Sequence, residues 1–243
     1  AYYKLDNLIG ILDVNRLGQR GETMYGHNTE AYQRRIASFG WETIVIDGHS
    51  FSEITDAYKQ AVNASGKPVM IIAKTVKGKG VSFLEDQDNW HGKALKKDEL
   101  ERALTELGTV DRSLIGKIPK PEDMQAVSKE PLQTPAAACD PAIPVATRRA
   151  YGNALGHIFS NHPNLVVLDA EVSNSTFADV FKKAHPDRFF EMFIAEQNMA
   201  GAAIGFSRRG KIPFVSTFAA FFTRAFDQIR MALDGAGSLL DEI

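Results

Sequence analysis

Short apolar runs alternate with segments of helical periodicity through the first hundred residues of the chain. Continuous apolar runs cover residues 8–14, 43–46 and 68–73, and runs of this length are typical of parallel strands. We expect the first of them to be covered on both faces. Apolar residues return every three or four positions between and after these runs, which predicts helices over residues 29–39, 50–62 and 98–107.

The predicted helix over residues 50–62 has a specific start signal. Ser50 followed by Glu53 matches a capping box, in which the hydroxyl accepts a hydrogen bond from the amide of the third helical residue. The carboxylate in turn accepts one from the amide of the cap. We therefore expect Ser50 and Glu53 to satisfy each other's backbone donors.

The same alternation returns in the last hundred residues. Apolar runs predict strands at residues 165–168, 189–194 and 212–216. Helical spacing predicts helices over residues 147–159, 177–184, 197–206 and 223–233. Two arrays of alternating strands and helices indicate an α/β protein with two parallel-sheet domains.

Residues 109–145 separate the two arrays and show neither periodicity. Six of the ten prolines of the chain fall in this stretch, as is typical of a semi-rigid interdomain linker. We therefore predict a first domain over residues 1–108, a linker over 109–145 and a second domain over 146–243.

Composition narrows the class of protein further. Of the 243 residues, 44% are apolar, which is enough for a sizeable core. The formal net charge of −2 gives no basic footprint for nucleic acid, and no apolar run is long enough to span a bilayer. The single Cys139 excludes an intramolecular disulfide. We expect a cytoplasmic protein that binds neither nucleic acid nor membrane, and because the chain begins at Ala1, we expect its natural start to lie upstream.

Polar residues that could bind a ligand follow two strands of the first array. Asn15, Leu17 and Gln19 come directly after the first strand, and ligands of open α/β sheets bind at such strand ends. An amide oxygen and a backbone carbonyl suit Mg²⁺, although an Asn there also commonly forms a turn. Lys77 lies in a lysine- and glycine-rich segment that also holds His91; it could approach a diphosphate or be a solvated basic loop.

The second array offers two further candidates. Arg148 opens a predicted helix and Ser175 lies near the next helix start, where backbone donors favour anions; an ordinary helix-initial Arg and Ser cap are the alternative. Glu196 ends an apolar strand, and Phe218, Phe221 and Phe222 follow the next strand. A carboxylate beside aromatic rings could hold a flat heteroaromatic cofactor, or the carboxylate could cap its helix while the rings fill the core.

These motifs together resemble the transketolases, thiamine-diphosphate enzymes that move two-carbon ketol units between sugar phosphates. The resemblance rests on the segments at residues 12–19, 74–80, 90–93 and 194–199 and on the run at 216–231, and it covers nearly all of residues 2–232. The family usually has Asp-Gly-Asp where this chain has Asp169-Ala170-Glu171. Deoxyxylulose-phosphate synthase is the runner-up within the same class of enzymes.

The resemblance implies a role for each candidate residue. Glu196 is similar to the catalytic glutamate beside the aminopyrimidine ring of the cofactor, and Phe221 to the ring that stacks on that pyrimidine. The Asn15 side chain and the Leu17 carbonyl match the Mg²⁺ ligands. Gln19 and Lys77 match residues that contact the cofactor. His91 matches a catalytic histidine that reaches both the diphosphate and the substrate. Arg148 and Ser175 match the residues that bind the sugar phosphate.

The resemblance also implies that both domains are incomplete in this chain. The opening aspartate of the diphosphate motif would fall before Ala1, and residues 233–243 do not continue the pattern of the family. A homodimer is implied for the intact enzyme, because opposite subunits supply the two cofactor-binding domains in this family. The alternative is a truncated, non-catalytic segment that associates with another chain.

Overall fold

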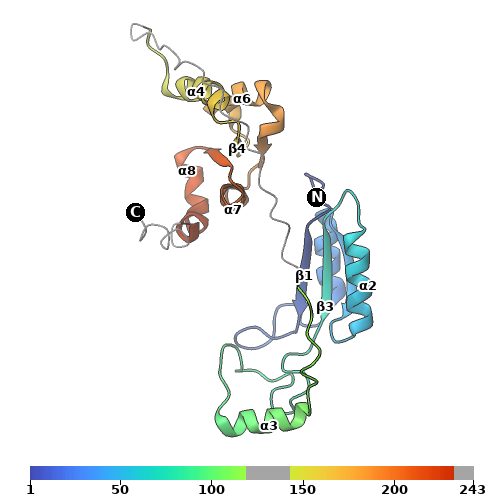
Figure 1. Ribbon diagram of the computed structural model, residues 1–243. Helices are drawn as coiled ribbons and strands as arrows, with labels where there is room; N and C mark the ends of the chain where they lie inside the picture. The colour runs from blue at the N-terminus through green and yellow to red at the C-terminus, as the bar shows by residue number, and fades with distance from the viewer. Residues whose placement is uncertain (119–142, 233–243) are drawn as a thin grey trace. The chain divides into compact units, whose positions relative to one another are not determined.

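Two compact units make up the chain, Ala1–Ile118 and Pro119–Ile243. The computed structural model describes residues 1–118 and 143–232, and each unit contains a three-stranded parallel sheet with helices (Figure 1). The predicted α/β class with two parallel sheets is therefore confirmed. Most of the predicted linker, Cys139 and the divergent tail lie outside the described residues, and the domain limits at residues 108 and 146 stay predictions.

The sheet of unit 1 has the strand order β1-β3-β2. All strands are parallel, and Val69 of β3 lies in register with Ile9 of β1 and Glu42 of β2. Every strand and helix predicted for this unit is present, with ends within one residue of those expected: β1 (Ile9–Val14), α1 (Thr29–Ser38), β2 (Glu42–Asp47), α2 (Phe51–Val62), β3 (Val69–Lys74) and α3 (Lys97–Leu107).

The core of unit 1 lies between α2 and one face of its sheet. Ala57 and Ala61 of α2 pack against Val69 and Ile71 of β3 in one buried cluster. On the edge strand β1, however, Ile11 is 58% exposed. The expectation that this strand is covered on both faces is therefore wrong, because in the described residues β1 pairs only with β3 and α2 does not reach across it.

The start of α2 differs in one bond from the predicted capping box. The Ser50 side chain accepts a hydrogen bond from the Glu53 amide, as expected. The Glu53 carboxylate instead accepts one from the amide of Asp47, at 2.8 Å. The Ser50 amide is already bonded to the Asp47 carbonyl, so Glu53 ties the end of β2 to the first turn of α2.

The sheet of unit 2 has the order β5-β4-β6, again with parallel strands. Its central strand is buried along its whole length, and Phe181 is the largest fully buried side chain. The elements are α4 (Thr147–Asn161), β4 (Leu165–Asp169), α5 (Ser173–Thr176), α6 (Ala178–Ala184), η1 (Pro186–Arg188), β5 (Phe189–Glu191), α7 (Glu196–Ser207), β6 (Ile212–Ser216), α8 (Ala219–Phe222) and η2 (Thr223–Ala225).

Close packing against α4 accounts for the short helix α5, which was not predicted, and for the start of α6. The helix expected over 177–184 begins at Ala178, because Phe177 has a left-handed backbone with φ of 62° and separates it from α5. A Cβ on Gly152 of α4 would lie 2.3 Å from the Phe177 carbonyl oxygen. Only glycine allows α4 to approach this junction so closely, and a residue 25 positions away is invisible to local periodicity.

Two other predicted elements differ at their ends. The strand expected over 189–194 stops at Glu191, and Phe193 has a positive φ of 56°. The helix expected over 223–233 is preceded by α8 and η2 and is regular only from residue 226 to residue 232 within the described chain. Among the described residues, no helix combines the length and the apolar character that crossing a membrane requires.

Candidate functional site

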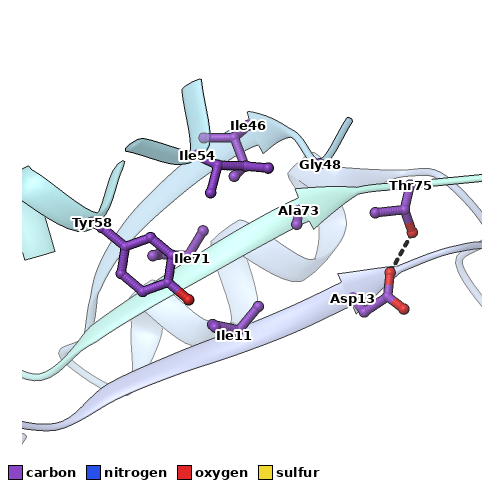
Figure 2. A pocket seen from close by; sticks show the side chains of 9 residues that line it. All are labelled: Ile11, Asp13, Ile46, Gly48, Ile54, Tyr58, Ile71, Ala73 and Thr75. Carbon is purple, nitrogen blue, oxygen red and sulfur yellow. Dashed lines mark hydrogen bonds between the residues drawn. The ribbon is translucent and has the colours of Figure 1, made fainter. Parts of the chain in front are cut away.

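The candidate residues of unit 1 lie in the two loops that follow β1 and β3. Asp13 at the end of β1 accepts a hydrogen bond from the Thr75 hydroxyl just beyond β3, and Figure 2 shows the two side chains pointing toward each other. His27 from the first loop reaches the Thr75 carbonyl oxygen at 2.7 Å. The carboxyl ends of the two strands are therefore joined by side chains as well as by the sheet.

Asn15 forms a turn directly after β1. Its side-chain oxygen accepts a hydrogen bond from the Leu17 amide at 3.1 Å, and its amide nitrogen donates to Asp13 at 3.1 Å. The turn reading that the sequence left open is thus the observed one. One lone pair of the Asn15 oxygen stays free for a ligand, because an amide oxygen has two.

Ion pairs and amide bonds connect the loop of Asn15 to the loop of Lys77. The Arg16 guanidinium bonds to the Asp86 carboxylate at 2.8 and 3.0 Å, and the Gly21 amide donates to Asp88 at 3.1 Å. Backbone hydrogen bonds, above all that from Gly21, hold the pKa of Asp88 below its usual range. The Asp86 amide also donates to the Lys77 carbonyl at 2.8 Å, so Lys77 is part of the same cross-connection.

The remaining predicted residues of unit 1 all have solvent-accessible side chains. Gln19 and His91 are exposed and Lys77 is half-buried. Next to His91, the Trp90 ring lies beneath the Lys93 ammonium at 4.2 Å. Within the described residues, no group of three or more His, Cys, Asp or Glu side chains is placed to hold a metal ion; the Asp13 carboxylate, which accepts a hydrogen bond from Asn15, lies beside the predicted pair of Asn15 and Leu17.

An apolar cavity of about 250 Å³ lies between α2 and the sheet of unit 1. Figure 2 shows Ile11, Ile71, Ile54 and Tyr58 around it, with the polar pair of Asp13 and Thr75 near the strand ends. Among the described residues, the cavity meets the cross-connected loops only at the carboxyl ends of β1 and β3, where Asp13 and Thr75 lie. None of the site residues predicted from the sequence lines the cavity.

Glu196 is a buried carboxylate at the first position of α7 in unit 2. The residue is 3% exposed, and its Oε2 accepts a hydrogen bond from the Arg224 guanidinium at 3.1 Å. Glu196 does not cap the helix with its side chain, because Ala195 holds the cap position. The Glu196 carboxylate is buried, and its charged partner Arg224 has an exposed side chain. Glu196 therefore differs from an ordinary solvated surface carboxylate.

Aromatic side chains lie close in sequence to the Arg224 partner. Phe218 and Phe221 stack at a centroid distance of 5.3 Å, and Phe221 is 48% exposed. Phe222 instead packs against the buried cluster around Met199. Two of the three rings are therefore available as a flat surface, and the reading of all three as core is wrong.

Arg148 lines a pocket of unit 2 with a volume of about 400 Å³, whereas Ser175 does not line it and only its neighbour Thr176 does. The Arg148 guanidinium lies over the Phe177 ring at 5.5 Å, and Ser175 precedes Thr176 in the short helix α5. Ser175 is thus inside a four-residue helix rather than at the start of the next one. The pocket is lined by Thr147, Arg148, Tyr151, Thr176, Val215, Ser216 and Thr217.

Hydroxyl groups dominate the polar lining of this pocket. Tyr151 and Ser216 share a hydrogen bond of 2.5 Å, and burial raises the pKa of Tyr151. The Thr217 hydroxyl is buried and has no hydrogen-bond partner among the described residues. An unsatisfied buried hydroxyl next to an arginine indicates a pocket suited to a polar, anionic ligand.

Asp169 is a functional candidate to which the sequence assigned no role, although it opens the Asp169-Ala170-Glu171 segment singled out above. It ends β4, is 0% exposed, and burial raises its pKa to about 6. Apart from its place in that motif, the signal in the local pattern was an aspartate closing a strand whose other residues are all apolar. That signal is weak, because aspartate at a strand end is also a common turn residue.

The fold and the sites together define a class of protein. Two parallel-sheet α/β units present polar groups at the carboxyl ends of their strands, one on cross-connected loops that carry Asn15 and Lys77 and one as a buried carboxylate paired with Arg224. Residues 1–133 match the family profile of the thiamine diphosphate binding domain of transketolase, and residues 143–240 match that of its pyrimidine binding domain. The chain belongs to the transketolase family.

Curated relatives agree with this assignment. The chain is 46% identical to human transketolase over 236 residues, which is 96% of this chain and 37% of the human protein. It is 44% identical to mouse transketolase-like protein 2, over 95% of this chain and 38% of that protein. The chain therefore spans less than two fifths of the length of these relatives.

Solved structures share the fold at lower identity. Transketolase from Campylobacter jejuni aligns with a TM-score of 0.65 and 22% identity, over 94% of this chain and 41% of that chain. Transketolase from Pichia stipitis, in complex with sedoheptulose 7-phosphate, aligns with a TM-score of 0.69 and 21% identity, over 93% and 41%. At these identities the similarity concerns the fold alone.

Proposed function

We propose that the chain carries part of the active site of a transketolase, which transfers a two-carbon ketol unit from a ketose phosphate to an aldose phosphate with thiamine diphosphate as cofactor. The observation that carries this proposal is the buried carboxylate of Glu196, held by Arg224, in the unit that also exposes the stacked Phe218 and Phe221. Membership of the transketolase family narrows the proposed reaction to ketol transfer, since the fold and the site alone would fit many reactions that use thiamine diphosphate.

The residues of unit 2 fit the pyrimidine half of the cofactor. Phe221 offers an exposed face for stacking, and the Oε1 atom of Glu196 is free to bond a ring nitrogen while Oε2 is held by Arg224. Thiamine diphosphate, when bound, would supply the electron sink that transfer of a two-carbon unit requires. We assign to Glu196 the role of holding a proton at the pyrimidine, and to Phe221 that of fixing the plane of the ring.

The residues of unit 1 fit the diphosphate half less completely. Gln19, Lys77 and His91 supply polar and basic groups on the two cross-connected loops, and His91 would also contact the substrate. Asn15 and the Leu17 carbonyl supply only neutral oxygens, whereas Mg²⁺ is usually bound through one or two carboxylates, phosphates and water. Mg²⁺ binding therefore needs ligands beyond these two, and we derive no step through the metal.

The Arg148 pocket is assigned to the phosphate group of the sugar. Arg148 offers paired guanidinium donors that match phosphate oxygens, and the unsatisfied Thr217 hydroxyl can add a neutral donor. We assign the same role to Ser175, which precedes the lining residue Thr176 in α5. A homodimer acting in the cytoplasm completes the proposal for the intact protein.

A second candidate function is that of a non-catalytic segment that associates with another chain. The exposed Leu8 and Ile11 along the edge strand β1 favour it, because an open apolar edge pairs readily with another strand. Turnover separates the two candidates, since only the first requires chemistry from this chain.

Calorimetric titration of the purified chain with thiamine diphosphate and Mg²⁺, followed by an assay of ketol transfer from xylulose 5-phosphate, tests the proposal. We expect cofactor binding that weakens about tenfold in Phe221→Ala, given the usual energy of an aromatic stack. Phe39→Ala, which removes an exposed ring in unit 1, is the matched control. Absence of cofactor binding would contradict the assigned sites, and clear turnover by the chain would exclude the second candidate.

A further inference from the structure

Asp169 lies behind the wall of the Arg148 pocket, where a carboxylate is unexpected. It is fully buried, and within the described ranges no cation forms an ion pair with it. It lies in register with Ser216 of β6, and it bonds to Thr176 of α5. Ser216 and Thr176 both line the pocket, so Asp169 is one residue removed from any ligand bound there.

The Asp169 carboxylate holds the turn that carries Ser175. Its Oδ1 accepts a hydrogen bond from the Val172 amide at 2.7 Å, and its Oδ2 accepts one from the Thr176 hydroxyl at 3.1 Å. Ser175 lies between these two partners in sequence, and its own amide donates to the Val172 carbonyl at 2.8 Å. The position of Ser175 therefore depends on the side chain of Asp169.

The hydrogen bonds of this turn can persist when Asp169 takes up a proton. The Thr176 hydroxyl lies within 3.1 Å of Asp169 Oδ2 and within 3.3 Å of the Val172 carbonyl. A protonated Asp169 can donate to the Thr176 oxygen, while the Thr176 hydrogen turns to the Val172 carbonyl. Protonation thus removes a negative charge next to the pocket without dismantling the turn.

We propose that Asp169 is the positioning residue of the Arg148 pocket and that its protonation state sets the affinity of the pocket for an anionic group. The inference rests on the proposed role of this pocket in holding a phosphate. An ionised Asp169 repels a bound anion and a neutral Asp169 does not. By linkage, an anion in the pocket also favours the protonated carboxyl by the same factor.

The groups around Asp169 are consistent with a proton equilibrium in the neutral range. Burial is the main cause of its raised pKa of about 6; Glu191 on β5 raises it further, and Lys182 on α6 lowers it. Among the described residues, the hydroxyls of Tyr151 and Thr176 and the Ser216 side chain are further polar groups on elements packed around Asp169. Arg148, on the pocket side, carries a fixed positive charge.

Sulfate is a suitable probe, because its charge stays at −2 across the pH range in which Asp169 titrates. We would measure its affinity for the full chain by NMR at pH 5.0 and 7.5 at constant ionic strength. We expect about fivefold tighter binding at pH 5.0, from the loss of one unit charge near the anion in a partly screened site. Asp169→Asn, with the neutral side chain that imitates the protonated carboxyl, should bind equally at both pH values and as tightly as the wild type at pH 5.0.

Arg148→Gln and Asp187→Asn separate this inference from the proposed pocket. Arg148→Gln should abolish sulfate binding, and Asp187→Asn, which removes an exposed carboxylate of the same unit, should keep the wild-type pH dependence. If Asp169→Asn keeps that dependence while Arg148→Gln loses sulfate, the inference fails and the anion pocket stands. If Arg148→Gln leaves sulfate binding unchanged, or if the wild type does not bind sulfate, both the inference and the proposed anion pocket are overturned.

The wild type alone provides a second test in case Asp169→Asn does not fold. The Val172 amide donates to Asp169, so its chemical shift reports the titration of that carboxyl. Without sulfate we expect a midpoint near pH 6, and saturating sulfate should move the midpoint upward by a few tenths of a pH unit or more. An unmoved midpoint would refute the inference whatever the variants do.

Discussion

The candidate residues of unit 1 and those of unit 2 are held by different kinds of interaction. In unit 1, ion pairs and amide bonds such as Arg16–Asp86 and Gly21–Asp88 connect two exposed loops. In unit 2, Glu196 and Asp169 are buried at the edges of elements. Exposed pairs contribute little stability and are screened by salt, whereas a buried carboxyl is strongly affected by its surroundings.

Under the proposed function, this difference would separate cofactor binding by unit 1 from proton handling by unit 2. Solvated side chains suit a strongly charged group such as a diphosphate, which needs counter-charge more than exact placement. A carboxyl that must hand over or hold a proton needs a fixed, desolvated position. Changes in unit 2 should therefore have large effects on reaction or folding, and changes in the loops of unit 1 small ones.

Glu196→Gln should have the largest effect. An amide cannot exchange the proton that the proposed role requires, so ketol transfer should fall by about two to four orders of magnitude, the usual contribution of acid–base catalysis. Steady-state assays on the catalytically competent assembly would measure it. Asp227→Asn, at an exposed carboxylate paired with Arg230, should stay close to wild type, and equal rates in the two variants would contradict the role of Glu196.

The pH dependence of unfolding should come next in size. The folded-state pKa of Asp169, about 6, lies above its ordinary value of 3.8, so its contribution to stability is full below about pH 4 and is lost as the pH rises to about 6. The loss should amount to about 2 to 3 kcal/mol, with no further change from this group above pH 6.

Hydrogen exchange of the β4 amides in urea would follow this change in unit 2. Both tryptophans, Trp41 and Trp90, lie in unit 1. Their fluorescence therefore reports the unfolding of unit 1, which serves as the internal reference for unit 2. Asp169→Asn should remove the decrease between pH 4 and pH 6 in β4. A decrease of the same size in the variant would show that other groups cause it.

Gly152→Ala should destabilise unit 2 by about 1 to 3 kcal/mol, as overpacking usually does. The new Cβ would meet the Phe177 carbonyl at 2.3 Å, so α4 or the α5–α6 junction must shift. Gly156→Ala is the control on the same helix, because a Cβ there meets nothing within 4 Å. It should instead stabilise the helix by about 0.5 to 1 kcal/mol; thermal unfolding of both variants, monitored by circular dichroism, would reveal whether their shifts have opposite sign.

Arg16→Gln should have the smallest effect. It removes the partly exposed ion pairs to Asp86 and Glu22, so the loop of residues 81–92 should exchange its amide hydrogens a few times faster with little change in global stability. Arg34→Gln, which breaks an exposed pair within α1, should leave this loop unaffected. Identical exchange in the two variants would mean that the Arg16 pairs do not restrain the loop.

Periodicity was sufficient for the elements of unit 1, because each of its strands and helices has one clear apolar repeat. It was less successful in unit 2 around Phe177 and Phe193, where positive φ values end elements within apolar stretches. These conformations are imposed by packing, such as that of Gly152 against Phe177. Backbone strain of this kind has no local signature unless a glycine occupies the strained position itself.

The sequence alone was enough to assign the α/β class, the family and the residue types at the candidate sites, since these depend on local pattern and on motif order. Only the tertiary structure placed Asp169 behind the Arg148 pocket, paired Glu196 with Arg224 and left Ile11 exposed. Burial and charge environment arise from elements far apart in the chain. A carboxyl group acquires its proton affinity from those distant neighbours and not from the residues beside it in sequence.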